Sequence, residues 1–442
     1  MKRRHFIRTT TATAAGASLL TYLPTTSHAA SRIMGANDRI NLGAIGVRGF
    51  GYHDLQSFLR NKEVECVAMA DVDRNILEKR AGEVKMIQGT QPEMYDDYRK
   101  LLERKDIDAV LIGVPDHWHC LIMVEACQAG KDIYIEKPIG NTIEECNIML
   151  KAAKRYDRVV QVGQWQRSDP HWMDAVNYVH SGKLGKIQTV KAWIYLAWEG
   201  EYPILPDEPV PDGVDYDFWL GPAPNRPFNK YRFHFTWRWF WDYAGGMMSD
   251  WGVHLLDYAL FGMDQYVPNS VTSSGGKYAF PDDAREVPDT QYTLYEFDDF
   301  GLSWETTVGI GKGNYDRVHG VAFIGRNGTL VVNREGWEVI PEDYKDNPTI
   351  EAVPLTLRDN SAGSGVDHHV RNFLQCLKTR EKPNANIDIA AHIARFSHMG
   401  NISLRTGRKL YWNPDKQQFI DDEQANELVK AHYRAPWKLP VV

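Results

Sequence analysis

The chain has 442 residues, which is enough for two or three domains with a substantial buried core. Hydrophobic residues make up 43% and charged residues 25% of the sequence, a mixture typical of globular proteins that excludes a disordered or fibrous chain. The 51 basic and 58 acidic residues leave a net charge of -7, so we expect no basic surface for a nucleic-acid backbone and no nucleic-acid partner.

The first 30 residues resemble a twin-arginine signal peptide. A basic head that includes Arg3 and Arg4 precedes a weakly apolar stretch, and the small residues Ser27 and Ala29 follow it. The apolar stretch is shorter than the roughly 20 residues that span a bilayer, so we expect no stable membrane span after processing. We therefore expect export to the periplasm.

The cysteines are five in number and contain no CxxC pair, which indicates neither a disulfide framework nor a zinc site. We interpret them as small buried hydrophobic residues. This agrees with a protein that folds in the reducing cytoplasm before export. The residues are Cys66, Cys120, Cys127, Cys146 and Cys376.

Strands and helices alternate over residues 38–160, which predicts a parallel, doubly wound α/β sheet of the dinucleotide-binding (Rossmann) type. The predicted strands are 39–46, 64–70, 109–114, 132–135 and 159–163, and the predicted helices are 53–60, 75–84, 121–129 and 142–156.

Residues 161–442 have a different character, with fewer helices and longer strands, and we expect an α+β domain with an open, mostly antiparallel sheet that binds the substrate. Asn327 and Gly328 mark a hairpin turn, and residues 201–229 form a proline-rich surface loop. The predicted strands are 188–196, 290–297, 301–308, 320–324 and 329–332, and the predicted helices are 367–379 and 388–404.

A glycine-rich turn follows the first strand and precedes a helix, as binding of a dinucleotide pyrophosphate requires. Gly46 and Gly51 occupy the first and third positions of a GxGxxG pattern, but Arg48 occupies the second, so Gly49 is expected to allow the close backbone approach. Asp71 ends the second strand, where its carboxylate would accept hydrogen bonds from a ribose. Together these residues predict NAD binding, with NADP possible because Arg48 and Arg74 could neutralise an added phosphate.

Polar residues also follow the third and fourth strands, at the same edge of the predicted sheet. Lys137 could donate a hydrogen bond to a substrate oxygen and stabilise a developing alkoxide, although an exposed turn lysine is the alternative. Pro115, His119 and Glu136 are expected to border the cofactor, and we interpret His117 as pocket wall and not as a chemical group.

Asp250 and His254 are four residues apart on a predicted helix, with Asp257 one turn further on. A carboxylate beside an imidazole suits general-base catalysis, but the spacing alone favours a helix-terminal charge and a packed histidine. Before this helix, Trp237, Arg238 and Trp239 could stack on a sugar and bind its hydroxyls, or could simply pack in the core or a subunit contact.

Several of these motifs together resemble the Gfo/Idh/MocA oxidoreductase family, which includes glucose/fructose oxidoreductase and inositol dehydrogenase. The resemblance rests on Glu136-Lys137-Pro138, on 115–119, on 163–167, on Gly245-Gly246 leading into 250–254, and on Gly407-Arg408-Lys409-Leu410. It implies a catalytic group of Lys137, Asp250 and His254, and substrate contacts from Gln166 and Arg167.

The resemblance further implies oxidation of a secondary hydroxyl of a sugar, glycoside or polyol to a ketone, with hydride transfer to NAD. We expect this NAD to be tightly bound, because an exported enzyme cannot draw on the cytoplasmic nicotinamide pool. One alternative is an NAD-dependent glycosidase that oxidises the ring transiently and eliminates the aglycone; another is a non-catalytic sugar-binding protein with a structural nucleotide. We expect a homo-oligomer. The histidines His234, His368 and His369 lack the spacing and partners of a metal site, so no metal is expected.

Overall fold

The computed structural model describes residues 39–343, 350–361 and 363–442 of the chain. The predicted signal peptide lies outside these residues. Of the helices that are described, none is both long and apolar enough to cross a membrane.

The first sheet in the described chain is parallel throughout and has six strands in the order β3-β2-β1-β4-β5-β6. This order reverses direction between β1 and β4, the point at which doubly wound sheets bind nucleotides. The strands are β1 Ile40–Ile45, β2 Val64–Ala70, β3 Glu93–Tyr95, β4 Ala109–Ile112, β5 Asp132–Ile135 and β6 Val160–Val162. The helices are α2 Gly49–Leu59, α3 Arg74–Gln88, α4 Tyr98–Leu102, α5 His119–Gln128 and α6 Ile143–Arg155.

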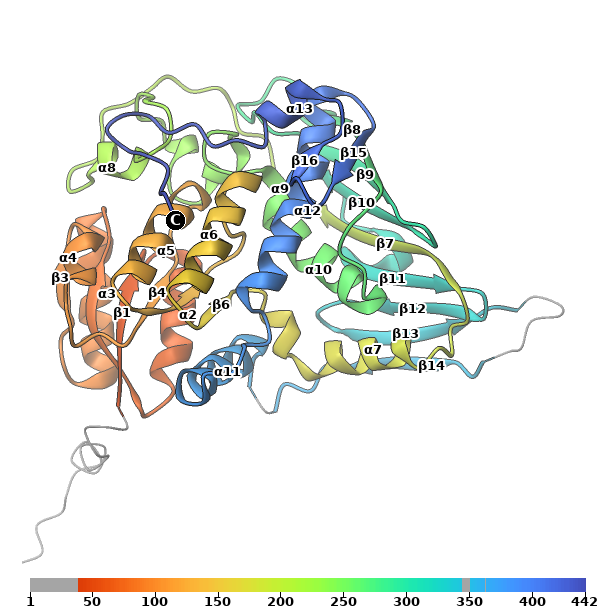
Figure 1. The fold of residues 1–442 in the computed structure, drawn as a ribbon, viewed down its shortest axis with the longest axis horizontal. Coiled ribbons are helices and arrows are strands. Elements are labelled where there is room, and N and C mark those ends of the chain that lie inside the picture. Colours follow the sequence, from red (N-terminus) through yellow and green to blue (C-terminus); the bar gives the residue numbers. More distant parts are fainter. Residues whose placement is uncertain (1–38, 344–349, 362) are drawn as a thin grey trace, which may run out of the picture. The chain divides into compact units, whose positions relative to one another are not determined.

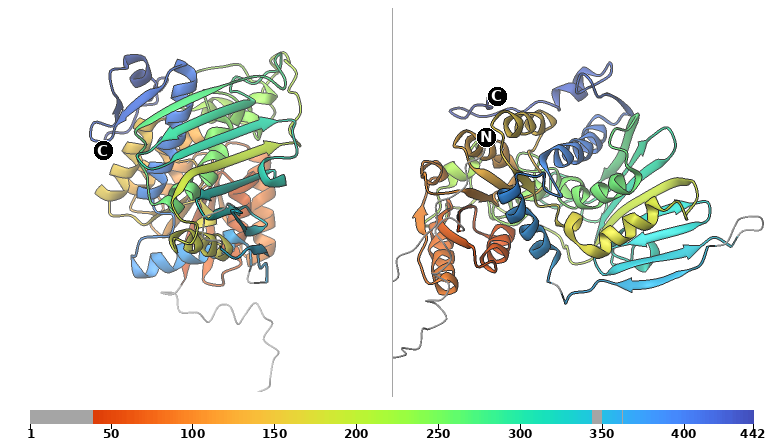
Figure 2. Two further views of the ribbon diagram at one scale, coloured as in Figure 1. Left: turned by 90° about the vertical axis from the view of Figure 1, so that its right-hand side faces the viewer. Right: turned by 60° about the horizontal axis from the view of Figure 1, so that its bottom comes forward.

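The second sheet has ten described strands in the order β14-β13-β12-β11-β7-β10-β9-β8-β15-β16, and every neighbouring pair except β7 and β10 is antiparallel. Figures 1 and 2 show α7, α10 and α12 on one face of this sheet. The strands are β7 Ile187–Leu196, β8 Ser270–Gly276, β9 Thr290–Glu296, β10 Gly301–Val308, β11 His319–Gly325, β12 Gly328–Val332, β13 Gly336–Pro341, β14 Val353–Leu357, β15 Leu410–Asn413 and β16 Gln418–Phe419. The helices are α7 Pro170–His180, α8 Tyr216–Leu220, α9 Gly246–Asp250, α10 Gly252–Met263, α11 Gly365–Thr379, α12 Ile387–Thr406 and α13 Glu423–Glu427.

The predicted fold class is confirmed, but some elements differ from the expectation. Helix α7 was not predicted, although Pro170 at its first turn is a common start signal. The proline-rich loop contains the short helix α8, whose first turn is capped by the side chain of Asp215. The predicted helix that carries Asp250 and His254 is divided at Trp251 into α9 and α10.

The hydrophobic cores do not divide where the sequence pattern changes. Residues of α11 and of the first half of α12 pack in the cores of the Rossmann sheet. Phe373 of α11 contacts the rings of Phe58 and Tyr134, with ring centroids 6.0 and 5.8 Å apart. The chain therefore returns from the second sheet to complete the first one.

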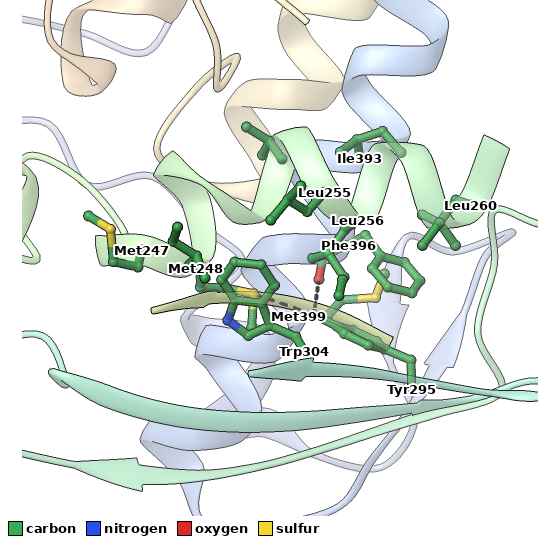
Figure 3. Close-up of a cluster of buried hydrophobic side chains, with 14 of the residues drawn as sticks. Met247, Met248, Leu255, Leu256, Leu260, Tyr295, Trp304, Ile393, Phe396 and Met399 are labelled. Carbon is green, nitrogen blue, oxygen red and sulfur yellow. Dashed lines mark hydrogen bonds between the residues drawn. The ribbon is translucent and has the colours of Figure 1, made fainter. Parts of the chain in front are cut away.

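Helix α10 is fixed between the second sheet and α12 by a cluster of buried side chains (Figure 3). Leu255, Leu256 and Leu260 of α10 are fully buried in it. Tyr295 of β9 stacks on Phe396 of α12 with ring centroids 3.9 Å apart, and its hydroxyl donates to the Phe396 carbonyl. Since buried aliphatic side chains of this size each contribute about 2 kcal/mol or more, α10 is a rigid support for the residues on its first turn.

Candidate active site

A cavity of about 420 Å³ runs from the glycine-rich turn after β1 to the first turn of α10. The nucleotide half of this cavity is bordered by the turn after β1 and by the end of β2. The substrate half is bordered by Lys137, Asp250, His254 and several aromatic residues. One continuous space thus joins the two predicted sites.

Close backbone packing shapes the nucleotide half. Gly51, in the first turn of α2, lies so near β1 that a Cβ atom there would be 2.3 Å from the Gly46 carbonyl oxygen. A Cβ on Gly113 would be 2.5 Å from the Gly51 Cα atom. Gly49 has a positive φ of 54°, and a Cβ there would meet open space. The N-terminus of α2 is therefore open toward the cavity and suited to a pyrophosphate.

Asp71 lies at the end of β2 and borders the same half. Its carboxylate accepts hydrogen bonds from the backbone N–H groups of Val47 and Asp73, at 2.9 and 3.0 Å. Burial raises the pKa of Asp71 to about 6, and these two hydrogen bonds oppose the rise. The glycine turn and this carboxylate fit the pyrophosphate and ribose of NAD.

The two cations near Asp71 have different surroundings. Arg48 borders the cavity, where burial lowers its pKa and the charges of Asp73 and Asp71 oppose that change. Arg74 pairs instead with Glu78 and Asp96, at 2.8 and 3.1 Å. Arg48 is therefore the cation placed to contact a bound nucleotide.

Segments from the second part of the chain lie against the β2–α3 turn. The N–H of Asp215 donates to the Val72 carbonyl at 2.9 Å, and the N–H of Arg74 donates to the Gly213 carbonyl at 2.8 Å. The ring of His234, which borders the cavity, lies 3.2 Å from the Asp73 carboxylate. These contacts narrow access to the nucleotide half.

Lys137 follows β5 and donates to Asp250 at both its carboxylate and, at 3.1 Å, its backbone carbonyl. The second carboxylate oxygen of Asp250 accepts from Arg238 Nε at 3.0 Å. Burial alone would raise the pKa of Asp250, but the charges of Lys137 and Arg238 hold it well below its usual range. Asp250 thus stays ionised and positions two cations at the cavity wall.

His254 lies on the first turn of α10, and only 6% of its surface is exposed. Its Nδ1 atom is buried and has no hydrogen-bond partner in the part of the chain that the structure describes. Burial, and then the charges of Lys137 and Arg334, hold the pKa of His254 well below its usual value of about 6.5. The imidazole is therefore neutral at pH 7 and can accept a proton, but Asp250 does not bond to it as the sequence suggested.

The aromatic strip before α9 is divided between the cavity and the core. Trp237 and Arg238 border the cavity, and the guanidinium of Arg238 lies 5.1 Å from the Trp237 ring centroid. Trp239 is fully buried, and the guanidinium carbon of Arg285 lies 4.6 Å from the centroid of the Trp239 ring. Its sequence position beside Arg238 had suggested a substrate contact.

Three other predicted site residues lie behind the cavity wall. The Nε and Nη2 atoms of Arg167 donate hydrogen bonds to the carboxylate of the buried Asp257, at 2.7 to 2.9 Å. Gln166 donates to the His254 carbonyl and accepts from Arg334. The ring nitrogens of His119 lie 2.9 and 2.6 Å from the carbonyl oxygens of Val114 and Pro138. These residues support wall segments, whereas Pro115 and Glu136 border the cavity directly.

Sequence reasoning missed two charged residues that border the substrate half, Asp116 and Arg334. Burial raises the pKa of Asp116 well above its usual value, which favours a neutral carboxylic acid. Asp116 stands in the motif after β4 and could have been considered there. Arg334 is in a turn between two strands of the second sheet, where no local pattern marks it.

The histidine pair considered as a metal site and the five cysteines lie in places that indicate a structural role. The ring nitrogens of His369 contact the Ser168 hydroxyl and the Val162 carbonyl. No group of three or more potential ligands among the described residues is arranged to hold a metal ion. All five cysteines are buried with free thiols.

Comparison with known families identifies both the N-terminal and the C-terminal part of the chain. Residues 40–164 match the profile described as the NAD-binding Rossmann fold of the GFO/IDH/MocA oxidoreductase family. Residues 174–293 and 354–439 match the profile of its C-terminal alpha/beta domain. The chain belongs to the Gfo/Idh/MocA oxidoreductase family. Its first domain is accordingly an NAD-binding domain, as the glycine turn and Asp71 predicted.

Individual proteins resemble the chain at lower identity. A glycosyl hydrolase family 109 protein of Shewanella putrefaciens is 27% identical over 42% of this chain and 44% of its own length. The chain thus matches less than half of this curated relative. Among solved structures, a levoglucosan dehydrogenase in complex with NADH and levoglucosan has a TM-score of 0.64 at 18% identity, covering 84% of this chain and 99% of its own. The aldose-aldose oxidoreductase of Caulobacter crescentus has a TM-score of 0.61 at 17% identity, covering 85% and 100%.

Proposed function

We propose that the protein oxidises a secondary hydroxyl of a sugar, glycoside or polyol to a ketone, with NAD as the hydride acceptor. The observation that carries this proposal is the group of Lys137, Asp250 and His254 at the far end of a cavity that begins at the nucleotide-binding turn. The names of the related dehydrogenase and oxidoreductase structures support a carbohydrate substrate.

Each residue of this group has a distinct role. Lys137 donates a hydrogen bond to the reacting oxygen and stabilises the negative charge that develops on it. His254 accepts the hydroxyl proton as the general base, because its imidazole is neutral. Asp250 holds the Lys137 ammonium in place. When NAD is bound, its nicotinamide ring supplies the acceptor for the hydride.

A redox-neutral glycosidase is the second candidate, and the name of the Shewanella relative favours it. In that reaction the ring hydroxyl is oxidised, the aglycone is eliminated, water adds and the ring is reduced again by the same nucleotide. The same three residues would serve the first and last steps.

Incubation of the purified protein with a panel of glycosides, followed by mass spectrometry, separates the candidates. A ketosugar lighter by two hydrogens supports the oxidoreductase, and a cleaved sugar of unchanged oxidation state supports the glycosidase. Sugar binding without turnover of any panel member would contradict both and favour a non-catalytic binding protein.

We further propose that the protein is exported by the twin-arginine route and retains its nucleotide. An exported enzyme cannot draw on the cytoplasmic nicotinamide pool, and the contacts of Asp215 and His234 with the β2–α3 turn oppose release of a bound dinucleotide. Mature protein isolated from the periplasm and then denatured should release nicotinamide nucleotide in near-stoichiometric amount. Recovery of nucleotide-free protein would contradict retention, and recovery only from the cytoplasm would contradict export.

We also propose that copies of the chain associate. Tyr292 and Leu294 of β9 are 50% and 39% exposed, on the face of the sheet opposite the one to which Tyr295 contributes. Large exposed apolar side chains on a sheet are typical of association surfaces. A monomeric mass in solution would contradict this proposal, and dissociation of a larger species by Leu294→Lys would support it.

A further inference from the structure

Arg334 occupies a tightly organised turn between β12 and β13. The side-chain oxygen of Asn333 accepts hydrogen bonds from the N–H groups of Glu335 and Gly336, at 3.1 and 3.2 Å. The Asn333 carbonyl lies 3.0 Å from the His171 ring nitrogen Nε2. The turn therefore holds Arg334 at a defined position on the wall of the substrate half.

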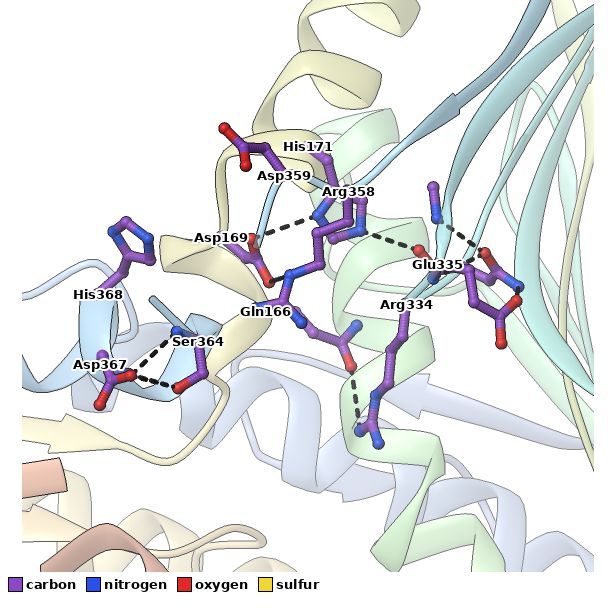
Figure 4. Close-up of polar contacts among 12 residues, drawn as sticks. Gln166, Asp169, His171, Arg334, Glu335, Arg358, Asp359, Ser364, Asp367 and His368 are labelled. Carbon is purple, nitrogen blue, oxygen red and sulfur yellow. Dashed lines mark hydrogen bonds and ion pairs between the residues drawn. The ribbon is translucent and has the colours of Figure 1, made fainter. Parts of the chain in front are cut away.

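The guanidinium of Arg334 is stacked against two indoles. Its central carbon lies 4.2 Å from the ring centroid of Trp251 and 4.9 Å from that of Trp165. Among the described residues, its one side-chain hydrogen bond is a long contact to Gln166 at 3.4 Å, which Figure 4 shows, and its Nε atom is buried without a partner. The stacking fixes the plane of the guanidinium while leaving N–H donors unused.

Neighbouring arginines differ from Arg334 in having acidic partners. Arg358 pairs with Asp169 at 3.0 Å (Figure 4), Arg167 with Asp257 and Arg238 with Asp250. In the described part of the chain, no carboxylate lies within ion-pair distance of the Arg334 side chain. A partly buried cation of this kind is costly unless a ligand supplies the missing charge.

The charge balance of the substrate half points in the same direction. Lys137, Arg238 and Arg334 contribute three positive charges around the single ionised carboxylate of Asp250. Burial raises the pKa of both Asp116 and Glu136, which favours their neutral forms. These two acids therefore offset little of the excess positive charge. An anionic substrate would restore neutrality.

We propose that the substrate is a sugar that carries a carboxylate, such as a uronic acid or its glycoside, and that Arg334 binds this group. The inference deepens the proposed sugar oxidation and rests on it. A flat guanidinium with two parallel donors matches a carboxylate in a bidentate manner, and the rings of Trp251 and Trp165 pack against this one. The cavity wall places this contact beside His254, so the acidic group also orients the sugar for proton removal.

Calorimetric titration of the NADH-loaded protein tests the assignment. The probes are methyl glucuronide, methyl glucoside and glucose 6-sulfate, which distinguish a carboxylate from a neutral group and from another anion. Arg334→Gln should weaken glucuronide binding roughly 10- to 150-fold and leave glucoside binding unchanged. Arg334→Lys should recover only part of the affinity, since it keeps the charge but not the planar fork.

The matched control is Arg326→Gln, an exposed arginine at the opposite end of β12, which should leave binding of every probe unchanged. Equal binding of glucuronide and glucoside by the wild type would overturn the proposal, as would preference for the sulfate. Arg334-dependent glucuronide binding, together with no oxidation or cleavage of the glucuronide by the NAD-loaded protein, would support the recognition and contradict the proposed reaction. Failure of every probe to bind would contradict both.

Discussion

The nucleotide half and the substrate half of the cavity are built in different ways. The first is formed mostly by backbone, in glycines of the turn after β1 and of α2 that approach neighbouring backbone to contact distance. The second is formed by side chains from segments far apart in sequence, such as Lys137, Asp250 and Arg334. Changes in the first should therefore act on binding and stability, whereas changes in the second should act on turnover and selectivity.

The largest expected effect is in the substrate half. His254→Ala should lower kcat about 10²- to 10⁴-fold, the usual cost of removing a positioned base, while NAD affinity measured by fluorescence titration stays unchanged. The control is His180→Ala, at an exposed position on α7. Near-normal turnover would remove His254 from the mechanism, and lost NAD affinity would show that the two halves are not separable.

A glycine substitution probes the nucleotide half at its closest contact. Gly51→Ala introduces a Cβ 2.3 Å from the Gly46 carbonyl oxygen, so we expect about 1–3 kcal/mol less stability and weaker NAD binding. Gly82→Ala is the matched control, because a Cβ in that part of α3 meets open space and helix propensity favours alanine by about 1 kcal/mol. Urea unfolding with and without NAD measures both effects. Equal behaviour of the two variants would contradict the role given to close backbone packing.

The ratio of NAD affinity to NADP affinity should change less than turnover or stability do in the preceding variants. Asp71 would repel a 2′-phosphate, so the wild type should prefer NAD, and Asp71→Asn should reduce that preference roughly 5- to 10-fold. Arg74→Gln should leave the ratio unchanged, because Arg74 is already paired with Glu78 and Asp96. Equal or tighter binding of NADP by the wild type would contradict this assignment.

The smallest effect concerns one pair of buried acidic side chains, Asp54 of α2 and Glu136 after β5. Asp54 and Glu136 lie close enough to share a hydrogen bond when either is protonated, and burial raises the pKa of both. The folded protein therefore keeps protons that the unfolded chain loses above about pH 4.5, so this pair destabilises the fold increasingly as pH rises. Asp54→Asn should reduce that decline, as thermal unfolding at pH 5 and pH 8 would measure. The exposed Asp174→Asn is the control, and the same decline in both variants would contradict the assignment.

The contrast between the halves also explains what could be predicted from sequence. The glycine turn and Asp71 lie in consecutive elements whose order determines their position, so pattern reasoning located them. Lys137 was located because it follows a strand of the same sheet. Arg334 enters the cavity only because β12 and β13 pair at a particular place in the second sheet, and no local spacing encodes that pairing.

Misassignments in the substrate half have the same physical cause. Arg167 and Trp239 have the residue types of sugar ligands, but the buried partners Asp257 and Arg285 occupy them, and these partners come from distant segments. Asp250 is bonded to Lys137 and Arg238, and the helix is divided at Trp251, between Asp250 and His254. Helical spacing alone could not reveal these two distant partners.

The return of α11 and α12 to the first sheet has a consequence for synthesis of the chain. Gln161 of β6 donates to the His369 carbonyl, which is 208 residues further along, and Glu145 of α6 accepts from the Tyr433 hydroxyl, 288 residues further along. As the chain grows from its N-terminus, the core of the first domain therefore stays incomplete until α11 and α12 have been synthesised.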